Sequence, residues 1–493
     1  MKSNIDILII GEGTYPYIRG GVSSWIHQLI SGLPEFKFGV LFIGSRREDY
    51  GEKRYKFPDN LVYFDEIYIF DKEELPIPKR RKLKKEYYQQ IETVHKSFNK
   101  EGNNLDAINR LIENISLEDF LYSNVSWEFI VNTYLEKYEN ESFIDYFWTI
   151  RNMHIPLWEI FKAINRIPRI KIVHSPSTGY AGFLAGLLKL NRNIPYILTE
   201  HGIYTRERKI DLLTSDWFST RRRFLKSMEE SSGLEFVWNK FFESIGRFSY
   251  YTADKILSLY EKARQIQIEY GAPKEKTMVI PNGVNIDRLK SCLEKRPSKN
   301  PKVIGLIGRV VPIKDIKTFI KAMRIVVNKI PDAEGWVVGP TDEDPEYYEE
   351  CKNLVKVLDL EKNVKFLGFQ NILDIFPKIS VNTLTSISEG MPLSILEGFA
   401  AGVPAVTTDV GSCFDIIYGG LNEEDKKLGN AGFVCKVADA KDLAKHYIKL
   451  LENEALWKKC QQVALERVNK FYTQELFFSN YKKLYYEALS WQE

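Results

Sequence analysis

Short apolar runs rich in Val, Ile and Phe alternate along the whole chain with amphipathic stretches, and several runs end at Gly or Pro. This alternation is typical of β-strands that are connected by helices. Six runs fall in the first half of the chain: IDILIIG (5–11), FGVLFIG (38–44), KIVHSPS (171–177), PYILTEHG (195–202), KILSLY (255–260) and TMVIPNG (277–283). Six more fall in the second half: KVIGLIG (302–308), GWVVGP (335–340), VKFLGF (364–369), SVNTLTS (380–386), PAVTTDVG (404–411) and GFVCKV (432–437).

Runs of this kind with helical connections predict parallel sheets whose two faces are both covered by helices. Two series of runs predict an α/β chain with two Rossmann-like, doubly wound domains. We place the seam in the polar segment 292–302, which contains two prolines, so the first domain covers 1–295 and the second covers 296–474. Between about 72 and 165 the strand rhythm gives way to helix-compatible sequence, which predicts a helical insertion in the first domain. Residues 475–493 are expected to form a terminal helix.

Composition narrows the class of protein. At 493 residues and 44% hydrophobic, the chain can bury more than one core. A net charge of +3 with 27% charged residues favours neither a nucleic-acid partner nor a disordered acidic chain. The five cysteines are scattered without a CxxC pair, which predicts neither a disulfide framework nor a zinc site and fits a reducing cytoplasm.

Membrane insertion is not expected from the sequence. The N-terminal apolar run stops at Gly11, too early for a signal-peptide core. The most apolar stretch, AGFLAGLLKL (181–190), is broken by a lysine. The basic run PKRRKLKK (78–85) has two interpretations, a solvated face or a contact with anionic lipid or a partner. We therefore expect a cytoplasmic protein and leave open a peripheral position at the inner face of the membrane.

The stretch ISEGMPLSILEG, which follows one of the apolar runs, contains a candidate anion site. Pro392 suits the first position of a helix. Met391 before it is not a capping residue, so the amides of Leu393 and Ser394 lack a side-chain partner. Free amides at a helix start stabilise anions, and Gly390 lets a ligand approach the backbone closely. The sequence therefore predicts a phosphate site at this turn.

Two glutamates, Glu389 and Glu397, flank the turn. Glu397 lies five residues past Pro392, which is about 7.5 Å along a helix axis at 1.5 Å per residue. That distance is about one sugar beyond a phosphate. Two carboxylates on either side of a diphosphate would hold hydroxyls of two sugars, such as a nucleotide ribose and a transferred hexose. The alternative for Glu397 is a solvated surface glutamate.

Five ordered pieces of sequence carry a family resemblance. The E-x7-E pattern, with GGVSSW (20–25), TEHG (199–202), PNGV (281–284) and GRVVPIKD (308–315), resembles the retaining family 4 glycosyltransferases of GT-B fold. The likeness covers nearly the whole chain apart from the insertion. More narrowly, EGTYPYIRGGVSSWIHQLI and TEHGIYTRERKIDL resemble the PelF-type cytoplasmic enzymes of Pel exopolysaccharide assembly. The resemblance implies two Rossmann-like domains facing a central cleft, with the terminal helix crossing back to the first domain.

The resemblance also implies roles for individual residues. Glu397 would accept hydrogen bonds from the ribose, and Glu389 would hold a donor-sugar hydroxyl near the reacting carbon. Arg309 and Lys314 would bind the diphosphate and offset the charge that develops as it leaves. His201 would lie beside the donor sugar and complete a catalytic set with Glu389, Arg309 and Lys314. The residues implied around the donor are Gly20, Gly21, Arg309, Lys314, Phe369, Glu389, Gly390, Met391, Pro392, Leu393, Ser394 and Glu397. Among them, Phe369 would contact the base through its backbone.

The implied reaction transfers a hexosyl unit from a UDP-sugar to a carbohydrate hydroxyl with retention. Same-face attack is expected, because no nucleophilic carboxylate for double displacement can be identified. No catalytic metal is expected. The D-x-D of TDEDPE (341–346) precedes a predicted helix, whose start favours acidic residues. No cofactor is expected either, since GEGTYPYIRGG has no third glycine at the spacing that a dinucleotide site requires.

The expected partners are the nucleotide-sugar, a carbohydrate acceptor and membrane-embedded polysaccharide export proteins, without nucleic acid. Position alone suggests that acceptor specificity lies in the first domain, around Glu12, Tyr15, Tyr17, Trp25 and Tyr204. Two other functions stay open at this point. One is a UDP-sugar epimerase of the same fold, and the other is a non-catalytic scaffold of a polysaccharide assembly complex.

Overall fold

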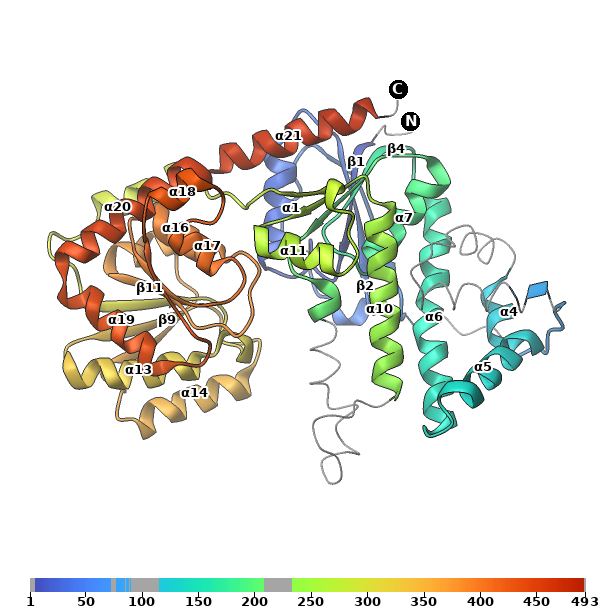
Figure 1. Cartoon of the computed structure of the whole chain (residues 1–493), viewed down its shortest axis with the longest axis horizontal. Coiled ribbons are helices and arrows are strands. Elements are labelled where there is room, and N and C mark those ends of the chain that lie inside the picture. Colours follow the sequence, from blue (N-terminus) through green and yellow to red (C-terminus); the bar gives the residue numbers. More distant parts are fainter. Residues whose placement is uncertain are drawn as a thin grey trace. The chain divides into compact units, whose positions relative to one another are not determined.

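The computed structural model describes residues 5–71, 77–84, 86, 87, 89, 115–207 and 233–491 (Figure 1). The chain divides into two compact units. Unit 1 comprises Met1–Leu257, Gln265–Met278 and Lys483–Glu493, and unit 2 comprises Ser258–Arg264 and Val279–Lys482.

Seven strands form the sheet of unit 1, in the order β3-β2-β1-β4-β5-β6-β7. Their bounds are β1 (Ile5–Glu12), β2 (Phe38–Gly44), β3 (Leu61–Tyr68), β4 (Ile170–Ser175), β5 (Tyr196–Glu200), β6 (Lys255–Ser258) and β7 (Thr277–Val279). The pairs from β3 through β5 are parallel, so the carboxyl ends of β1, β4 and β5 lie along one edge. Nearly every position of β1, β2 and β4 is buried, which is why these strands read as continuous apolar runs.

The strand β3 was not among the predicted runs. It lies at the edge of the sheet, and Ile67 is its one buried residue. Asp65 and Glu66 interrupt its apolar sequence. A half-exposed edge strand needs no continuous apolar run, so the pattern that marks central strands did not mark this one.

Helices cover this sheet, among them α1 (Gly21–Gly32), α7 (Tyr180–Arg192) and α10 (Gly233–Thr252). The apolar helix α7 packs against β1, β4 and β5 and against α10. The predicted helical insertion is present between β3 and β4 as α4 (Leu117–Tyr122), α5 (Asn124–Lys137) and α6 (Phe143–Arg166). Ser116, Ser123 and Ser142 cap these three helices, each accepting a backbone N–H from the first turn. Much of the predicted insertion, including 91–114, lies outside the described residues.

Six strands form the sheet of unit 2, in the order β10-β9-β8-β11-β12-β13, and all its pairs are parallel. The strands are β8 (Val303–Ile307), β9 (Glu334–Val338), β10 (Val364–Gly368), β11 (Val381–Leu384), β12 (Ala405–Thr408) and β13 (Gly432–Cys435). Among its helices are α12 (Ile286–Glu294), α13 (Ile316–Lys329), α14 (Pro345–Val357), α15 (Ile372–Ile375), α16 (Leu393–Ala400), α17 (Cys413–Tyr418), α18 (Glu423–Lys427), α19 (Ala440–Glu452), α20 (Glu454–Phe471) and the first part of α21 (Gln474–Ser490). Both sheets are therefore doubly wound α/β sheets, as predicted.

An ion pair lies inside unit 2. Arg467 on α20 donates from Nε to Asp425 Oδ1 at 2.6 Å, and neither side chain is exposed. Arg467 also donates to the carbonyls of Ile417 and Gly429. With several partners on one guanidinium, the buried charges are compensated, and α20 is tied to the α17–α18 region.

The division into units differs from the predicted domain bounds. The chain passes from unit 1 to unit 2 between Met278 and Val279, ahead of the predicted seam at 295/296, because α12 packs against α16 of unit 2. The terminal helix α21 has residues in both units, and from Lys483 onward it belongs to unit 1. There the Tyr485 hydroxyl lies 2.7 Å from Nδ1 of buried His174, whose Nε2 lies 2.8 Å from Thr199 Oγ1.

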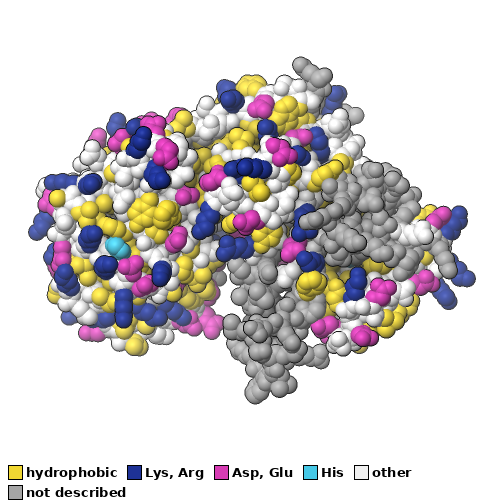
Figure 2. Space-filling model, in the orientation of Figure 1, with side chains coloured by type: hydrophobic (Ala, Val, Ile, Leu, Met, Phe, Trp, Pro, Cys, Tyr) yellow, Lys and Arg dark blue, Asp and Glu magenta, His cyan; other side chains and the backbone are white. Residues whose placement is uncertain are grey.

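The surface carries both signs of charge. On the face shown in Figure 2, Lys and Arg side chains are interspersed with Asp and Glu side chains over unit 2. None of the helices that the structure describes combines the length and the apolar character that a membrane-spanning segment requires.

Candidate active site

The predicted anion site lies where β11 leads into α16. Pro392 is the N-cap of α16 and Leu393 is its first residue, one position later than predicted. No side chain caps this helix, and its first turn has no acidic residue. Ile395 N–H bonds back to the Pro392 carbonyl, so the earlier amides of Leu393 and Ser394 remain for a ligand. This helix start therefore offers backbone donors and the positive end of the helix dipole to an anion.

Glu389 and Lys314, which are 75 residues apart in sequence, are in direct contact in the structure. Lys314 Nζ donates to Glu389 Oε1 at 2.5 Å, and the Ser386 hydroxyl donates to the same oxygen at 2.5 Å. Less than a fifth of either charged side chain is exposed. Thr385 Oγ1 donates to the Lys314 carbonyl at 2.8 Å and so fixes the backbone that carries the lysine. Two of the predicted catalytic residues thus meet at the carboxyl ends of β8 and β11.

Arg309, the other predicted phosphate ligand, follows β8 and is half exposed. Its Nη1 donates to Glu343 Oε1 at 2.5 Å. Glu343 belongs to the acidic segment TDEDPE, in which Asp344 caps α14 by accepting the Tyr347 N–H at 2.9 Å. That segment therefore begins a helix and pairs with Arg309. Asp315, the residue after Lys314, caps α13 by accepting the Thr318 N–H.

Glu397 lies on α16, largely buried. Burial raises the pKa of its carboxyl to about 7, and the nearby charge of Arg288 opposes only part of that increase. A carboxyl with this pKa titrates near neutral pH, so the charge of Glu397 depends on the groups that bind beside it.

Two loops that the role assignments had left out support the Gly-Met-Pro turn. The Asn282 N–H of the PNGV segment points to the sulfur of Met391 at 3.3 Å, and both residues are buried. Gly411, after β12, has a φ of +55°, and a Cβ there would lie 2.1 Å from the Gly390 carbonyl oxygen. Ser412 N–H donates to that same oxygen at 2.9 Å. In the sequence, PNGV was a matching segment without a role, and the second loop was only the end of the apolar run PAVTTDVG.

In unit 1, Gly20 is the N-cap of α1 and Gly21 is its first residue, and no side chain caps this helix. A Cβ at either glycine would meet nothing within 4 Å. His201 follows β5, and its ring meets Trp25 edge-on with 4.6 Å between centroids. Burial lowers the pKa of His201 to about 3, which keeps the imidazole neutral.

In unit 2, Phe369 after β10 is 73% exposed, and its predicted contact with a base stays a prediction.

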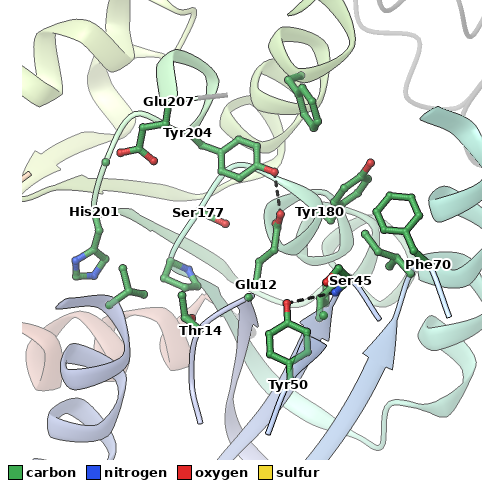
Figure 3. A pocket seen from close by; sticks show the side chains of 18 of the residues that line it. Glu12, Thr14, Ser45, Tyr50, Phe70, Ser177, Tyr180, His201, Tyr204 and Glu207 are labelled. Carbon is green, nitrogen blue, oxygen red and sulfur yellow. Dashed lines mark hydrogen bonds between the residues drawn. The ribbon is translucent and has the colours of Figure 1, made fainter. Parts of the chain in front are cut away.

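A cavity of about 680 Å³ lies within unit 1, and His201 is part of its lining (Figure 3). It opens at the carboxyl ends of β1, β4 and β5, and its lining includes Glu12, Thr14, Ser177, His201 and Tyr204. The Tyr204 hydroxyl donates to Glu12 Oε1 at 2.8 Å (Figure 3). Two of the five residues predicted for acceptor specificity, Glu12 and Tyr204, therefore line a cavity.

The other three residues predicted for acceptor specificity point elsewhere. Tyr15 is fully buried and packs on His27 and Tyr55. Trp25 is also buried, and Tyr17 donates its hydroxyl to Glu66 on β3. These three side chains are not part of the cavity lining, because position in the chain does not say which way a side chain turns. Their part in acceptor specificity stays a prediction.

Within the described part of the chain, one group of side chains has metal-ligating atoms close together. The atoms belong to Cys435, Asp442 and His446, and they lie within 4.8 Å of one another. None of these residues is among the predicted donor ligands. The absence of a catalytic metal stays a prediction.

The chain is similar to known glycosyltransferases in sequence. It is 30% identical over 193 residues to N-acetyl-alpha-D-glucosaminyl L-malate synthase of Bacillus anthracis, a match that covers 39% of this chain and 47% of that protein. It is 26% identical over 298 residues to UDP-Gal:alpha-D-GlcNAc-diphosphoundecaprenol alpha-1,3-galactosyltransferase of Escherichia coli, which covers 57% of this chain and 66% of that protein. The chain thus spans between about half and two thirds of the length of these two relatives.

Solved structures share the architecture over nearly the whole chain. HepE of Anabaena in complex with UDP matches with a TM-score of 0.60 at 14% identity, covering 97% of this chain and 99% of that one. Sucrose-phosphate synthase of Thermosynechococcus elongatus matches with a TM-score of 0.59 at 15% identity, covering 99% of both chains. The likeness shows the predicted GT-B fold, with two Rossmann-like domains.

Two families match the two halves of the chain. Residues 293–467, which contain the Lys314–Glu389 contact and Glu397, match the family described as glycosyl transferases group 1. Residues 5–275, which contain the cavity of unit 1, match the family described as a domain of unknown function, DUF3492. Since this second match spans more than half of the chain, the protein belongs to the DUF3492 family, joined here to a domain of glycosyl transferases group 1.

Proposed function

We propose that the protein is a retaining, metal-independent hexosyltransferase that moves a sugar from a UDP-sugar to a carbohydrate hydroxyl in exopolysaccharide synthesis of the Pel type. The observation that carries this proposal is the contact of Lys314 with Glu389 next to the uncapped start of α16. A cation and free backbone amides suit a diphosphate, and a carboxylate beside them suits a sugar hydroxyl.

In the proposed donor complex, the diphosphate takes the place of Glu389 on Lys314 Nζ. Arg309 turns from the exposed Glu343 carboxylate to a phosphate oxygen, an exchange that costs little because surface ion pairs are weak. Glu389, released from the lysine but still held by Ser386, accepts a hydroxyl of the donor sugar. Glu397, further along α16, accepts the ribose hydroxyls.

In the proposed reaction, the acceptor oxygen forms a bond to the anomeric carbon on the face that the diphosphate leaves. The bond from that carbon to the diphosphate oxygen breaks, and its electron pair goes to the diphosphate. The acceptor proton moves to the departing phosphate oxygen, so no protein base is required. Lys314 and Arg309 stabilise the charge on the leaving group, which is the largest charge change in the reaction. Glu389 positions the sugar and forms no covalent bond to it.

The relatives support a UDP-sugar donor. The Escherichia coli relative is named as a transferase that uses UDP-Gal. Structures of HepE, which has this fold, are known with UDP, with UDP and glucose, and with UDP-glucose. A capsular polysaccharide biosynthesis glycosyltransferase of Staphylococcus aureus is also similar, at 22% identity over 276 residues. The proposed Pel-type role would give the protein membrane-embedded export proteins as partners.

The test is thermal stabilisation of the purified protein by UDP, GDP and ADP at equal concentrations. We expect UDP to raise the melting temperature selectively, and we expect Glu397→Ala to lose this effect. Glu361→Ala, at an exposed glutamate elsewhere in unit 2, is the matched control and keeps it. No stabilisation by any nucleotide would favour a non-catalytic scaffold. Interconversion of free UDP-sugars without an acceptor would identify an epimerase instead.

A further inference from the structure

We propose that the cavity of unit 1 binds an uncharged sugar ring of the acceptor glycan and excludes acceptors that present a phosphate or a carboxylate there. The inference deepens the proposed function and depends on it for the identity of the ligand as acceptor. It distinguishes this protein from the two relatives described above, whose names specify malate and a diphospholipid-linked sugar.

Four buried polar atoms in the lining have no hydrogen-bond partner among the described residues. They are Thr14 Oγ1, Ser177 Oγ, His201 Nε2 and Trp238 Nε1. The four residues come from four separate segments: the loops after β1, β4 and β5, and helix α10. Buried polar groups in folded proteins are nearly always hydrogen-bonded, so four unpaired groups around one cavity indicate a polar ligand or water.

These groups match the hydrogen bonding of a sugar ring. The hydroxyls of Thr14 and Ser177 can donate or accept, as each hydroxyl of a sugar can. The imidazole of His201 is neutral, so its Nε2 either donates or accepts, depending on the tautomer. The indole N–H of Trp238 only donates, and it requires an oxygen acceptor such as a ring or hydroxyl oxygen. None of the four carries a charge that would single out an anion.

The remaining walls are largely apolar and aromatic. Aromatic side chains line the cavity: Tyr50, Phe70, Tyr180, Tyr204, Trp238 and Phe242. Three of the rings lie close to one another. Trp238 stacks on Phe242 with 5.7 Å between centroids, and Tyr204 meets Phe242 edge-on at 5.9 Å. Flat apolar faces of this kind pack against the C–H face of a sugar ring, while the few polar groups set its orientation.

The charged residues of the described lining are both acidic. Glu12 and Glu207 are carboxylates, and the described lining contains no Lys or Arg. Glu12 is held in place from two sides, since Oε1 accepts from the Tyr204 hydroxyl and Oε2 accepts the Ala181 N–H at 3.2 Å, at the start of α7. A phosphate or carboxylate in this cavity would face the like charge of Glu12, and the described lining offers it no Lys or Arg. The cavity therefore favours an uncharged ring over an anionic one.

The test compares three matched trisaccharides by calorimetry on the full chain: cellotriose, triacetylchitotriose and trigalacturonate. We expect at least one of the two neutral trisaccharides to bind about tenfold or more tightly than trigalacturonate. Trp238→Phe keeps the ring and removes only the N–H, and Ser177→Ala removes only the hydroxyl. Each is expected to weaken binding of the neutral trisaccharide by about three- to tenfold. The matched control, Trp127→Phe on the exposed surface of α5, leaves it unchanged.

Three results would overturn the inference. One is equal or tighter binding of trigalacturonate. The second is neutral binding that neither Trp238→Phe nor Ser177→Ala affects. The third is no binding of either neutral trisaccharide. Stabilisation by UDP, measured on the same preparations, separates these results from a failure of the proposed function, because Lys314, Glu389 and Glu397, which would hold UDP, lie in unit 2 and the cavity lies in unit 1.

Discussion

Replacing Glu397 by glutamine tests whether burial of this carboxyl couples protein stability and nucleotide binding to pH. Burial raises its pKa from an ordinary value of 4.5 to about 7. The folded protein therefore holds the proton more tightly than the unfolded chain does. Below about pH 4.5 both states are protonated, and the carboxyl does not affect stability. As the pH rises from 4.5 to 7 the unfolded chain ionises first, so stability falls, and above pH 7 the loss is complete.

The magnitude follows from the two pKa values. The difference between about 7 and 4.5 corresponds to about 3 kcal/mol at 1.36 kcal/mol per pKa unit. Glutamine does not titrate. The free energy of unfolding of Glu397→Gln, measured relative to that of the wild type, should therefore increase by about 2–3 kcal/mol as the pH rises from 5 to 8. The assay is urea unfolding of both proteins at each pH, with Glu361→Gln as the exposed control. A difference in unfolding free energy that stays constant with pH would refute the reasoning.

Binding of UDP should show the opposite dependence on pH. The proposed ribose contact requires the ionised carboxylate, whose fraction falls about tenfold per pH unit below its pKa. We therefore expect the ratio of wild-type to Glu397→Gln affinity to fall as the pH is lowered from 8 to 6. The ratio removes the titration of the UDP phosphate itself, which is common to both proteins. An unchanged ratio would show that Glu397 does not bind the ribose as a carboxylate.

Three further predictions concern the described contacts. Lys314→Met removes the cation from Glu389 and from the leaving diphosphate, so we expect a loss of about 100-fold or more in kcat for sugar transfer, measured by UDP release. Asp425→Ala leaves Arg467 buried without its carboxylate, which should destabilise the protein by about 3–5 kcal/mol in urea unfolding. Gly411→Ala forces a Cβ to within 2.1 Å of the Gly390 carbonyl oxygen at a φ of +55°, so we expect weaker UDP binding and a lower melting temperature.

Each of these predictions has a matched control. For Lys314, the retained thermal stability of Lys314→Met would show that lost turnover reflects chemistry, whereas full turnover would contradict the role. For Asp425→Ala, the control is Lys329→Met, which breaks an exposed ion pair with Glu452 and should barely change the midpoint of urea unfolding. For Gly411→Ala, the control is Gly368→Ala. Gly368 has a φ of +64°, but no atom lies within 4 Å of an added Cβ, so this variant tests backbone strain without the clash that occurs at Gly411. If both alanines weaken UDP binding equally, the packing of Gly411 against the turn is not the cause.

Much of the fold could be predicted from the sequence. Strands such as β1 and β4 are buried on both faces, so each appears as an apolar run that can be recognised locally. The edge strand β3 escaped prediction because partial exposure allows Asp65 and Glu66 in its middle. The bare start of α16 was also visible in the sequence, since Met-Pro cannot supply a capping side chain.

Tertiary structure alone decided which side chains meet. Lys314 and Glu389 are far apart in sequence and touch because β8 and β11 are adjacent parallel strands, whose carboxyl ends share one edge of the sheet. Thr14, Ser177 and Trp238 carry no sequence signal of a site, yet the order of strands brings them around one cavity. Tyr15 and Trp25 lie in a segment that resembled a binding loop, but packing turns them into the core. The spacing of apolar residues along the sequence determines which face of a helix or strand is buried. The packing of elements that are distant in sequence determines which residues each buried side chain contacts.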